Sequence, residues 1–389
     1  MSIRPVLTAV LCSLAILASC EKKPATPETS DSAAQTQATS PAEPANTKPA
    51  NAEPTLATNE PTETPPVDLA DSPLMRYGLA EAIPTPPGEI RLATYNIENL
   101  FDDRDDPNLS GRYEDIDDTK PESQKQAVAE AIRVLNADIL AVEEVESLEA
   151  ITEFRDEYLS DMGYQYLVSL DAGDERGIEQ AVLSRFPIVE TQQWVGAELG
   201  GTHPEMYGDK PNWHAGEPIR FHRSPLMVTI EVPAEKTEGE PYRLTLLAVH
   251  HKSGKFSDYW REKESAGVME IIQAFQHADP SRNIIVLGDF NAQVTDDSVK
   301  TYLNGGMHDV FEGRNGNEIV SHASGRRIDL ILANDAAMGE IDPKSSFVLG
   351  TVSAPEGMSW DDAHMLPGYA SDHFPVAVDI TPREQPAGG

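Results

Sequence analysis

The stretch Asn283-Ile-Ile-Val-Leu-Gly-Asp289-Phe-Asn291 decides the fold class, because an apolar strand ends abruptly on an Asp and an Asn. Residues two apart in a strand point the same way. Asp289 and Asn291 therefore project together where the strand leaves the sheet, just after a permissive glycine. A second strand-like run starts at residue 374, directly after the pair Asp372 and His373. Two polar pairs at two strand ends indicate one site.

From residue 90 onward, short apolar runs rich in β-branched residues alternate with longer amphipathic runs. These patterns predict helices at 122–136, 147–161 and 259–277. They predict strands at 90–96, 138–143, 164–169, 179–184, 225–232, 242–249, 283–288, 326–332 and 374–380. Many strands and few crossover helices favour an α/β or α+β fold in which two sheets pack together with helices outside.

Polar groups also occupy the ends of other predicted strands, namely Asn96, Glu144 and His250. Alone, Asn96 or Glu144 is more often a solvated loop residue, but the set has a common chemistry. Its oxygen ligands suit Mg²⁺ or Mn²⁺, and its histidines suit a phosphate oxyanion or proton transfer. Metal-assisted phosphoester hydrolysis is the reaction that uses all of these groups.

Six motifs then resemble, in order, those of the endonuclease/exonuclease/phosphatase superfamily, which includes pancreatic-type deoxyribonucleases, abasic-site endonucleases, inositol-polyphosphate phosphatases and neutral sphingomyelinases. They are Ala93-Thr-Tyr-Asn96-Ile-Glu-Asn, Leu140-Ala-Val-Glu-Glu144-Val, Val249-His250-His-Lys-Ser, Gly288-Asp289-Phe-Asn291, Arg327-Ile-Asp329-Leu-Ile-Leu and Ser371-Asp372-His373. The resemblance runs from about Arg91 to Ile380. It implies a four-layer α/β/β/α sandwich of two packed mixed β-sheets flanked by helices, with the site at one edge of the sheets.

The resemblance also implies a role for each matching residue. Glu144 is the principal metal ligand, supported by Asn96 and, directly or through water, by Asp372. Asp289 orients or deprotonates the attacking water. Asn291 and His250 hold the scissile phosphate. His373 stabilises the charge that builds on the phosphate, and Asp329 fixes the tautomer of His373.

Three positions near these motifs have two interpretations each. Arg176 resembles part of a turn in bacterial members, where it either meets the phosphate or forms a structural salt bridge. Glu143 stands where the family usually has Gln, so it either makes the metal site more anionic or faces away. Val249 replaces a usually polar residue, and His251 is either a surface residue or a helper.

The N-terminus reads as a targeting segment, with Arg4, an apolar run and then Leu17-Ala18-Ser19-Cys20, which resembles a bacterial lipobox. This implies cleavage before Cys20 and lipid attachment to its thiol; the alternative, an uncleaved transmembrane helix, would need roughly 20 apolar residues. We divide the chain into a lipoprotein signal peptide (1–20), a disordered Pro/Thr/Ala/Glu-rich tether (21–88), a catalytic domain (89–383) and a disordered tail (384–389). Glu21 after the cysteine favours outer-membrane sorting, so we expect an envelope protein anchored through Cys20.

The formal net charge is −35, a field that opposes a polyanion such as DNA unless divalent cations in the site reverse it locally. A solubility adaptation is the preferred interpretation. The acidic segment 102–118 lacks the spacing of a calcium loop, because Pro107 falls where a ligand is needed, and is interpreted as a solvated loop. The aromatic-rich segment 196–224 either packs onto the fold or contacts bases or lipid.

The first functional hypothesis is a Mg²⁺-dependent (or Mn²⁺-dependent) phosphodiesterase, an endonuclease acting on nucleic acid, working as a monomer. The second is a phosphatase or a lipid phosphodiesterase, which the membrane tether and the acidic surface suit better. The third is a non-catalytic binding module displayed on the envelope. It is the least favoured, because every position that the chemistry needs is present.

Overall fold

The computed structural model describes residues 74–383 except 108, 110–115, 238 and 356. The chain divides into two units, residues 1–64 and 65–389, and every described residue belongs to the second. The signal peptide, Cys20, most of the expected tether and the tail at 384–389 lie outside the described residues, as does part of the acidic segment 102–118.

Two six-stranded mixed sheets form the centre of the described unit. In spatial order, the first contains β15 (Phe347–Val348), β16 (Val376–Ile380), β1 (Ile90–Leu100), β2 (Ile139–Val145), β4 (Glu179–Ser184) and β3 (Tyr166–Ser169). The second contains β13 (Met307–Asp309), β14 (Asp329–Asn334), β12 (Asn283–Asp289), β11 (Tyr242–His250), β10 (Leu226–Val232) and β5 (Ile188–Gln192). In each sheet the two middle strands are parallel, β1 with β2 and β11 with β12, and every other pairing is antiparallel.

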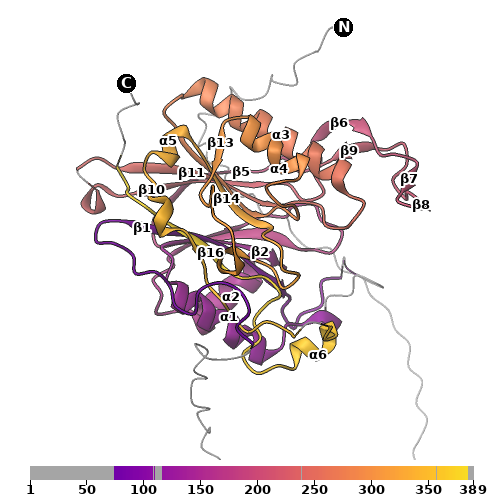
Figure 1. The fold of residues 1–389 in the computed structure, drawn as a ribbon, viewed down its shortest axis with the longest axis horizontal. Helices are drawn as coiled ribbons and strands as arrows, with labels where there is room; N and C mark the ends of the chain where they lie inside the picture. Colours follow the sequence, from indigo (N-terminus) through magenta and orange to yellow (C-terminus); the bar gives the residue numbers. More distant parts are fainter. Residues whose placement is uncertain (1–73, 108, 110–115, 238, 356, 384–389) are drawn as a thin grey trace, which may run out of the picture. The chain divides into compact units, whose positions relative to one another are not determined.

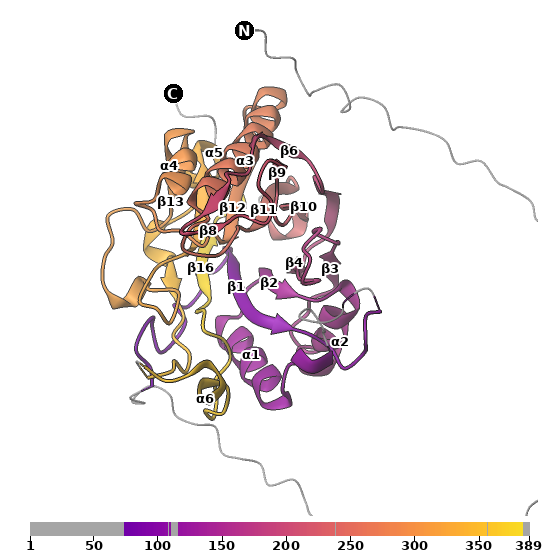
Figure 2. The ribbon, with the colours of Figure 1, turned by 90° about the vertical axis from the view of Figure 1, so that its right-hand side faces the viewer.

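The helices and hairpins lie outside these sheets (Figures 1 and 2). The helices are α1 (Glu122–Leu135), α2 (Leu148–Tyr158), α3 (Asp258–Ala278), α4 (Asp297–Asn304), α5 (Asp335–Met338) and α6 (Trp360–His364). Two small antiparallel pairs, β6 (Glu198–Thr202) with β9 (Pro218–Arg220) and β7 (Met206–Tyr207) with β8 (Lys210–Pro211), form a projection beside α3.

Three apolar cores hold the layers together. The central core lies between the sheets and joins residues such as Leu92 and Ala141 of the first sheet to Leu246 and Leu287 of the second. A second core packs the outer face of the first sheet against α1 and α2. A third packs the outer face of the second sheet against α3 and α4. The predicted four-layer α/β/β/α sandwich is therefore confirmed, and Figure 2 shows the layers in order.

Local sequence explains where the first two helices begin and end. Pro121 precedes α1, and proline suits the start of a helix because the first helical N–H groups have no intrahelical partner. The C-cap residue Asn136 follows Leu135, and its left-handed φ of 51° ends the helix. Ser147 caps α2 by accepting the N–H of Ala150 at 3.1 Å.

The predicted elements all exist, but several ends differ. The helix predicted at 147–161 ends at Tyr158, the strand predicted at 326–332 begins only at Asp329, and β1 continues past Asn96 to Leu100. The tether predicted at 21–88 extends too far toward the C-terminus, because residues from 74 onward already contact the domain. Leu79 donates its N–H to the carbonyl of Val348 at 2.8 Å, and Tyr77 packs on the central core.

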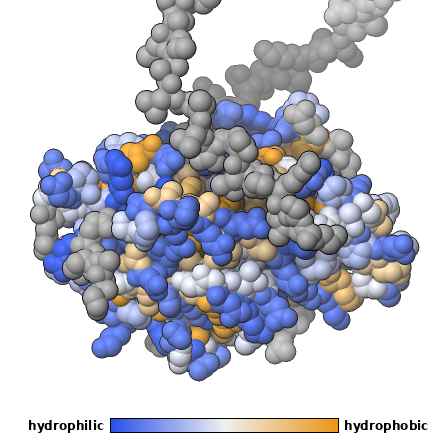
Figure 3. Space-filling view, turned by 90° about the horizontal axis from the view of Figure 1, so that it is seen from above, coloured by the Kyte–Doolittle hydropathy of each residue, from blue (hydrophilic) through white to orange (hydrophobic). Residues whose placement is uncertain are grey.

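The face of the molecule shown in Figure 3 is largely hydrophilic, with apolar side chains in small separate patches. Among the described residues, none of the helices combines the length and the apolar character needed to span a bilayer.

Candidate active site

Three polar residues form a row across three adjacent strands of the second sheet. His250 at the end of β11 is the register partner of Asp289 at the end of β12, and Asp289 is the partner of Asp329 at the start of β14. All three are at most 2% exposed. Sheet pairing therefore brings together residues that lie up to 79 positions apart in the sequence.

Gly288 makes the close approach at this row possible. Its φ is +131°, and a Cβ at this position would lie 2.0 Å from the carbonyl oxygen of Val249 and 3.0 Å from Oε1 of Glu143. Any side chain would push β12 away from β11 or from the facing sheet. The glycine before Asp289 is thus required by the backbone, as the sequence motif predicts.

Asn291 fixes the Asp289 carboxylate. The backbone N–H of Asn291 donates to Oδ1 at 2.7 Å, and its Nδ2 donates to Oδ2 at 2.9 Å and to the carbonyl of His251 at 3.1 Å. Burial and the nearby Asp329 carboxylate raise the pKa of Asp289, against the opposing effect of His373. A carboxylate with a raised pKa suits the acceptance of a proton from water.

Asp329 orients His373. Nδ1 of the imidazole lies 2.9 Å from both oxygens of the carboxylate, and Ser321 donates its hydroxyl to Oδ2 of Asp329 at 2.7 Å. Burial lowers the pKa of His373, but Asp329, Asp372 and Asp289 outweigh it and hold that pKa well above its usual value. The ring therefore carries a proton and presents Nε2, 3.9 Å from Oδ2 of Asp289.

The first sheet contributes Asn96 and Glu144. Nδ2 of Asn96 donates to Oε1 of Glu144 at 3.2 Å and, across the sheets, to Oδ2 of Asp289 at 3.4 Å. Nε2 of His250 lies 3.7 Å from the same Glu144 oxygen and 3.5 Å from Asp289. Burial lowers the pKa of His250 well below its usual value, and Arg223 adds to this, so its ring is neutral.

Left-handed backbone is concentrated here. Among the described residues, five that are not glycine have positive φ, and four of these, Glu98, Asn99, Glu144 and Asn291, lie on the segments that form the site. Such backbone costs on the order of 1–3 kcal/mol per residue and persists where the surroundings enforce it. At Glu144 the reversal interrupts strand alternation, so that Glu143 points between the sheets while Glu144 reaches the site edge.

Glu143 lies between the sheets beside Gly288, close enough for Asp329, Asp289 and His373 to affect its pKa. It is fully buried, accepts the hydroxyl of Thr94 at 2.8 Å, and burial raises its pKa well above the usual value. The raised pKa favours the neutral form of Glu143 and so opposes any addition of negative charge to the site. His251 is not a surface residue either: it is 3% exposed, and its Nε2 bonds the hydroxyl of Tyr302 at 2.8 Å.

Arg176 lies on the neighbouring loop, where its guanidinium donates to the side-chain oxygen of Asn99 at 2.6 Å. Asp174 holds this loop by accepting the N–H of Arg176 at 2.7 Å. Oδ2 of Asp174 lies 2.8 Å from Nε of Arg223, and Nη1 of Arg223 donates to the carbonyl of His250 at 3.2 Å. This buried ion pair connects the Arg176 loop to the end of β11, and the sequence motifs did not identify it.

Asp372 lies on the other side of His373, with Oδ1 3.8 Å from Nε2 of that ring. Its N–H donates to Oε2 of Glu98 at 3.2 Å, and Oδ2 is 3.2 Å from Nε2 of His322. Sequence reasoning missed His322 and Glu98. Glu98 falls within the quoted Tyr95-Asn96-Ile97-Glu98 stretch, whereas the sequence around His322 carries no signal for its position.

The donor set fits a divalent cation. The Asn96 amide lies between the carboxylates of Glu144 and Asp289, with Nδ2 3.2 Å and 3.4 Å from their oxygens. A bound cation would offset the charge of these carboxylates, which the protonated His373 ring balances only in part. The predicted ligands Asn96 and Glu144 are in contact, while Asp372 joins from the side of His373. Oxygen donors of this kind suit Mg²⁺ or Mn²⁺.

The sequence model of the Endonuclease/Exonuclease/phosphatase family matches residues 93–373, and the chain belongs to this family. Members are hydrolases that act on phosphoesters and typically depend on a divalent metal. The match includes every predicted site residue from Asn96 to His373, so family and geometry coincide on one region.

Similar solved structures include the human Nocturnin catalytic domain with bound sulfate, at 15% identity over 76% of this chain and 95% of that one, with a TM-score of 0.47. A truncated Caenorhabditis elegans TDP2 has 14% identity over 75% and 97%, with a TM-score of 0.49. A Bacteroides thetaiotaomicron mannosyl-6-phosphatase has 18% identity over 74% and 98%, with a TM-score of 0.45. A search among curated proteins gave no significant match.

Proposed function

We propose that this protein is a divalent-metal-dependent phosphodiesterase that cleaves nucleic acid as an endonuclease outside the cytoplasm. The observation that carries the proposal is the meeting of two sheet edges. The row of His250, Asp289 and Asp329 on one sheet faces Asn96 and Glu144 on the other, with Nδ2 of Asn96 3.4 Å from Asp289.

Each group has one task in this reaction. Asp289, held by Asn291, orients a water and takes its proton. Neutral His250 donates a hydrogen bond to a non-bridging phosphate oxygen. Asn291 donates to the phosphate as well when its Nδ2 exchanges the bond to the His251 carbonyl for one to the substrate. His373, kept protonated and oriented by Asp329, stabilises the charge that grows on the phosphate in the transition state. A divalent cation, when bound by Glu144, Asn96 and Asp372, supplies further charge neutralisation.

The net charge of −35 argues for a second candidate. A long polyanion is repelled by an acidic protein, whereas a phosphomonoester or a phospholipid headgroup is repelled less. The second candidate is therefore a phosphatase or lipid phosphodiesterase acting on envelope substrates.

The deciding experiment incubates the purified protein with supercoiled plasmid and millimolar Mg²⁺ or Mn²⁺, with and without EDTA. Parallel reactions contain phospholipid vesicles, inositol phosphates and small phosphomonoesters. We expect nicking by the wild type and none by Asp289→Ala. Asp161→Ala is the matched control, because that aspartate is 71% exposed and pairs with Arg133 at the surface. Turnover of a lipid or monoester without nicking would establish the second candidate instead.

We further propose that lipid attached to Cys20 anchors the protein in the bacterial cell envelope, and that residues after it act as a spacer. The lipobox-like stretch ending at Cys20 supports this. Cell fractionation tests it: the wild type should label with a fatty acid and sediment with membranes. The Cys20→Ser variant should lose the label, and retention of label by that variant would refute the anchor.

A further inference from the structure

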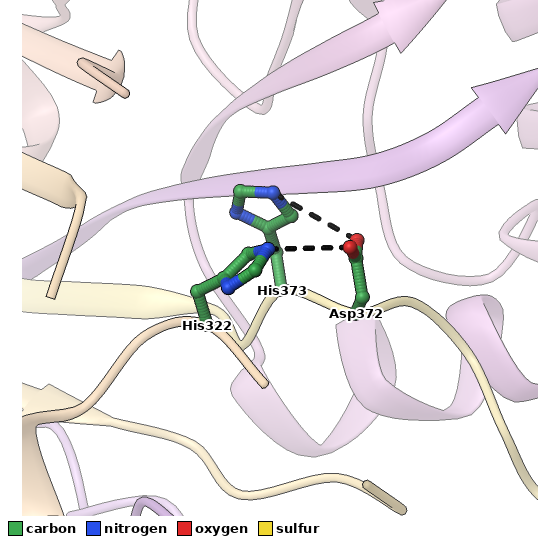
Figure 4. A group of neighbouring side chains, drawn as sticks. All are labelled: His322, Asp372 and His373. Atoms are coloured by element: carbon green, nitrogen blue, oxygen red, sulfur yellow. Dashed lines mark ion pairs between the residues drawn. The ribbon is translucent and has the colours of Figure 1, made fainter. Parts of the chain in front are cut away.

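Two imidazoles and one carboxylate converge at the edge of the proposed active site. Nε2 of His322 lies 3.2 Å from Oδ2 of Asp372, and Nε2 of His373 lies 3.8 Å from Oδ1. The three ligand atoms all lie within 4.8 Å of one another. Figure 4 shows a nitrogen of each ring pointing at the same carboxylate.

The backbone holds this arrangement in place. The segment around His322 runs antiparallel to the segment around His373. The N–H of Ala323 donates to the carbonyl of Asp372 at 2.7 Å, and the N–H of Phe374 donates to the carbonyl of Ser321 at 2.7 Å. The two rings are therefore side by side, with centroids 4.5 Å apart and planes at 78°. No large movement is needed to bring their nitrogens to one ion.

The far nitrogen of each ring already has a partner. Nδ1 of His373 is held by Asp329 at 2.9 Å. Nδ1 of His322 accepts the backbone N–H of Ser324 at 2.9 Å and lies 2.7 Å from the Ser324 hydroxyl oxygen. For His373 the Asp329 carboxylate is the usual support of a metal-binding histidine, because it accepts from Nδ1 and leaves Nε2 as the coordinating nitrogen. In His322 the accepting Nδ1 places the ring proton on Nε2, so a bound ion would displace that proton.

We propose that His322, Asp372 and His373 form a site for a borderline divalent cation of the Zn²⁺ type. Two imidazole nitrogens and one carboxylate oxygen are the donor set of many zinc sites with an open fourth position, whereas Mg²⁺ prefers oxygen donors alone. The site is reachable, since the side chains of Asp372 and His322 are 35% and 17% exposed. It differs in donor chemistry from the oxygen-rich set around Glu144.

Occupation of this site has a regulatory consequence, which rests on the proposed function. An ion held there displaces the proton from Nε2 of His373, takes that nitrogen away from the phosphate and shares the Asp372 carboxylate with the Mg²⁺ site. Zn²⁺ therefore inhibits Mg²⁺-dependent hydrolysis through His322, a residue that takes no part in the hydrolysis itself.

The binding test uses metal-stripped protein without substrate. Zn²⁺ affinity is measured by calorimetry and by the rise in melting temperature, and Co²⁺ serves as a spectroscopic probe of the nitrogen ligands. We expect His322→Gln to weaken binding by at least about tenfold and to abolish the Co²⁺ spectrum. His308→Gln is the matched control, because His308 also lies 2.6 Å from a carboxylate, that of Asp335, outside this cluster.

Equal Zn²⁺ affinity in the wild type and His322→Gln overturns the site, as does the absence of binding in the wild type. Far-ultraviolet circular dichroism of the metal-free variant checks that it is folded. A protein that binds Zn²⁺ but cleaves no phosphoester would refute the proposed function and leave the site standing.

The inhibition test adds Zn²⁺ to Mg²⁺-dependent plasmid nicking. The wild type should lose activity as the Zn²⁺ site fills, at concentrations that match the calorimetric affinity. The activity of His322→Gln, expressed relative to its own rate with Mg²⁺ alone, should resist Zn²⁺. Equal inhibition of both proteins would refute regulation through His322.

Discussion

Nδ1 of His373 lies 2.9 Å from each carboxylate oxygen of Asp329, which leaves Nε2 as the nitrogen that faces the site. The carboxylate also keeps the ring protonated. In Asp329→Asn both effects are lost, because a neutral amide neither raises the pKa of the imidazole nor accepts from it with both atoms. We predict a fall in kcat of about 10²–10⁴-fold with a smaller change in KM, measured on a small diester substrate with Mg²⁺. An unchanged kcat, in a variant that melts like the wild type, would contradict this role for Asp329.

The ion pair between Asp174 and Arg223 is buried, with side chains 1% and 2% exposed. Arg223→Met leaves the Asp174 carboxylate without its buried cation, which we predict to cost about 3–5 kcal/mol of unfolding free energy in urea titration. Combining it with Asp174→Asn should recover part of this loss, because the uncompensated charge is removed. If the single and double variants were equally unstable, the pair would not be the source of the effect.

Glu143 is neutral in the folded protein, because burial raises its pKa well above the usual value. Glu143→Gln should therefore keep both melting temperature and activity close to wild type, since the Gln side-chain oxygen can still accept the hydroxyl of Thr94. Glu144→Gln, one residue along, is the contrasting variant and should lose Mg²⁺-dependent turnover. A strong loss of activity in Glu143→Gln would mean that Glu143 works as a charged group.

The stability of the protein should depend on pH through Glu264, whose carboxylate accepts the N–H groups of His222 and Lys252 at 2.9 Å and 2.8 Å. Burial raises its pKa from 4.5 to about 7. Between pH 4.5 and 7 the folded state holds a proton that the unfolded state releases. The stabilisation that protonated Glu264 gives the folded protein is therefore present below pH 4.5 and is lost as pH rises to 7.

Comparison of the wild type with Glu264→Gln isolates the contribution of the Glu264 carboxyl to the pH dependence of stability. The unfolding free energy of the wild type minus that of the variant should fall from pH 5 to pH 7 and stay level above it, measured by urea titration at constant ionic strength. A difference that is independent of pH would show that Glu264 titrates normally.

Most of the fold was predictable because its signal is local. Buried strands such as Asn283–Asp289 are short apolar runs with abrupt polar ends, and α1 shows helical spacing of Val128, Ile132 and Leu135. The missed elements lack such a signal. β5 is mostly exposed, and α4 has only eight residues. Residues 74–88 read as tether because their contacts with Leu349 and the core are long-range.

The candidate site was predictable to the extent that strand ends carry motifs. His250, Asp289 and Asp329 each end or begin a strand, and sheet register then places them in one row. His322 and Arg223 could not be found in this way. His322 reaches Asp372 from a loop that is positioned by isolated backbone bridges to Arg326 and His373. Arg223 acts through a buried contact with Asp174, and no spacing rule pairs these two residues.

The position of β16 in the first sheet has a consequence for biosynthesis. Although it is the last strand in the chain, β16 lies between β15 and β1, pairing Val378 with Leu92. When β16 pairs with β1, Asp372 and His373 also reach Glu98 and Asp329, which are synthesised before them. Until β16 is made, the nascent chain therefore has β1 unpaired on one side and lacks Asp372 and His373. Pairing so distant in sequence is slow, and under the proposed function a partly synthesised chain would lack Asp372 and His373 and be inactive.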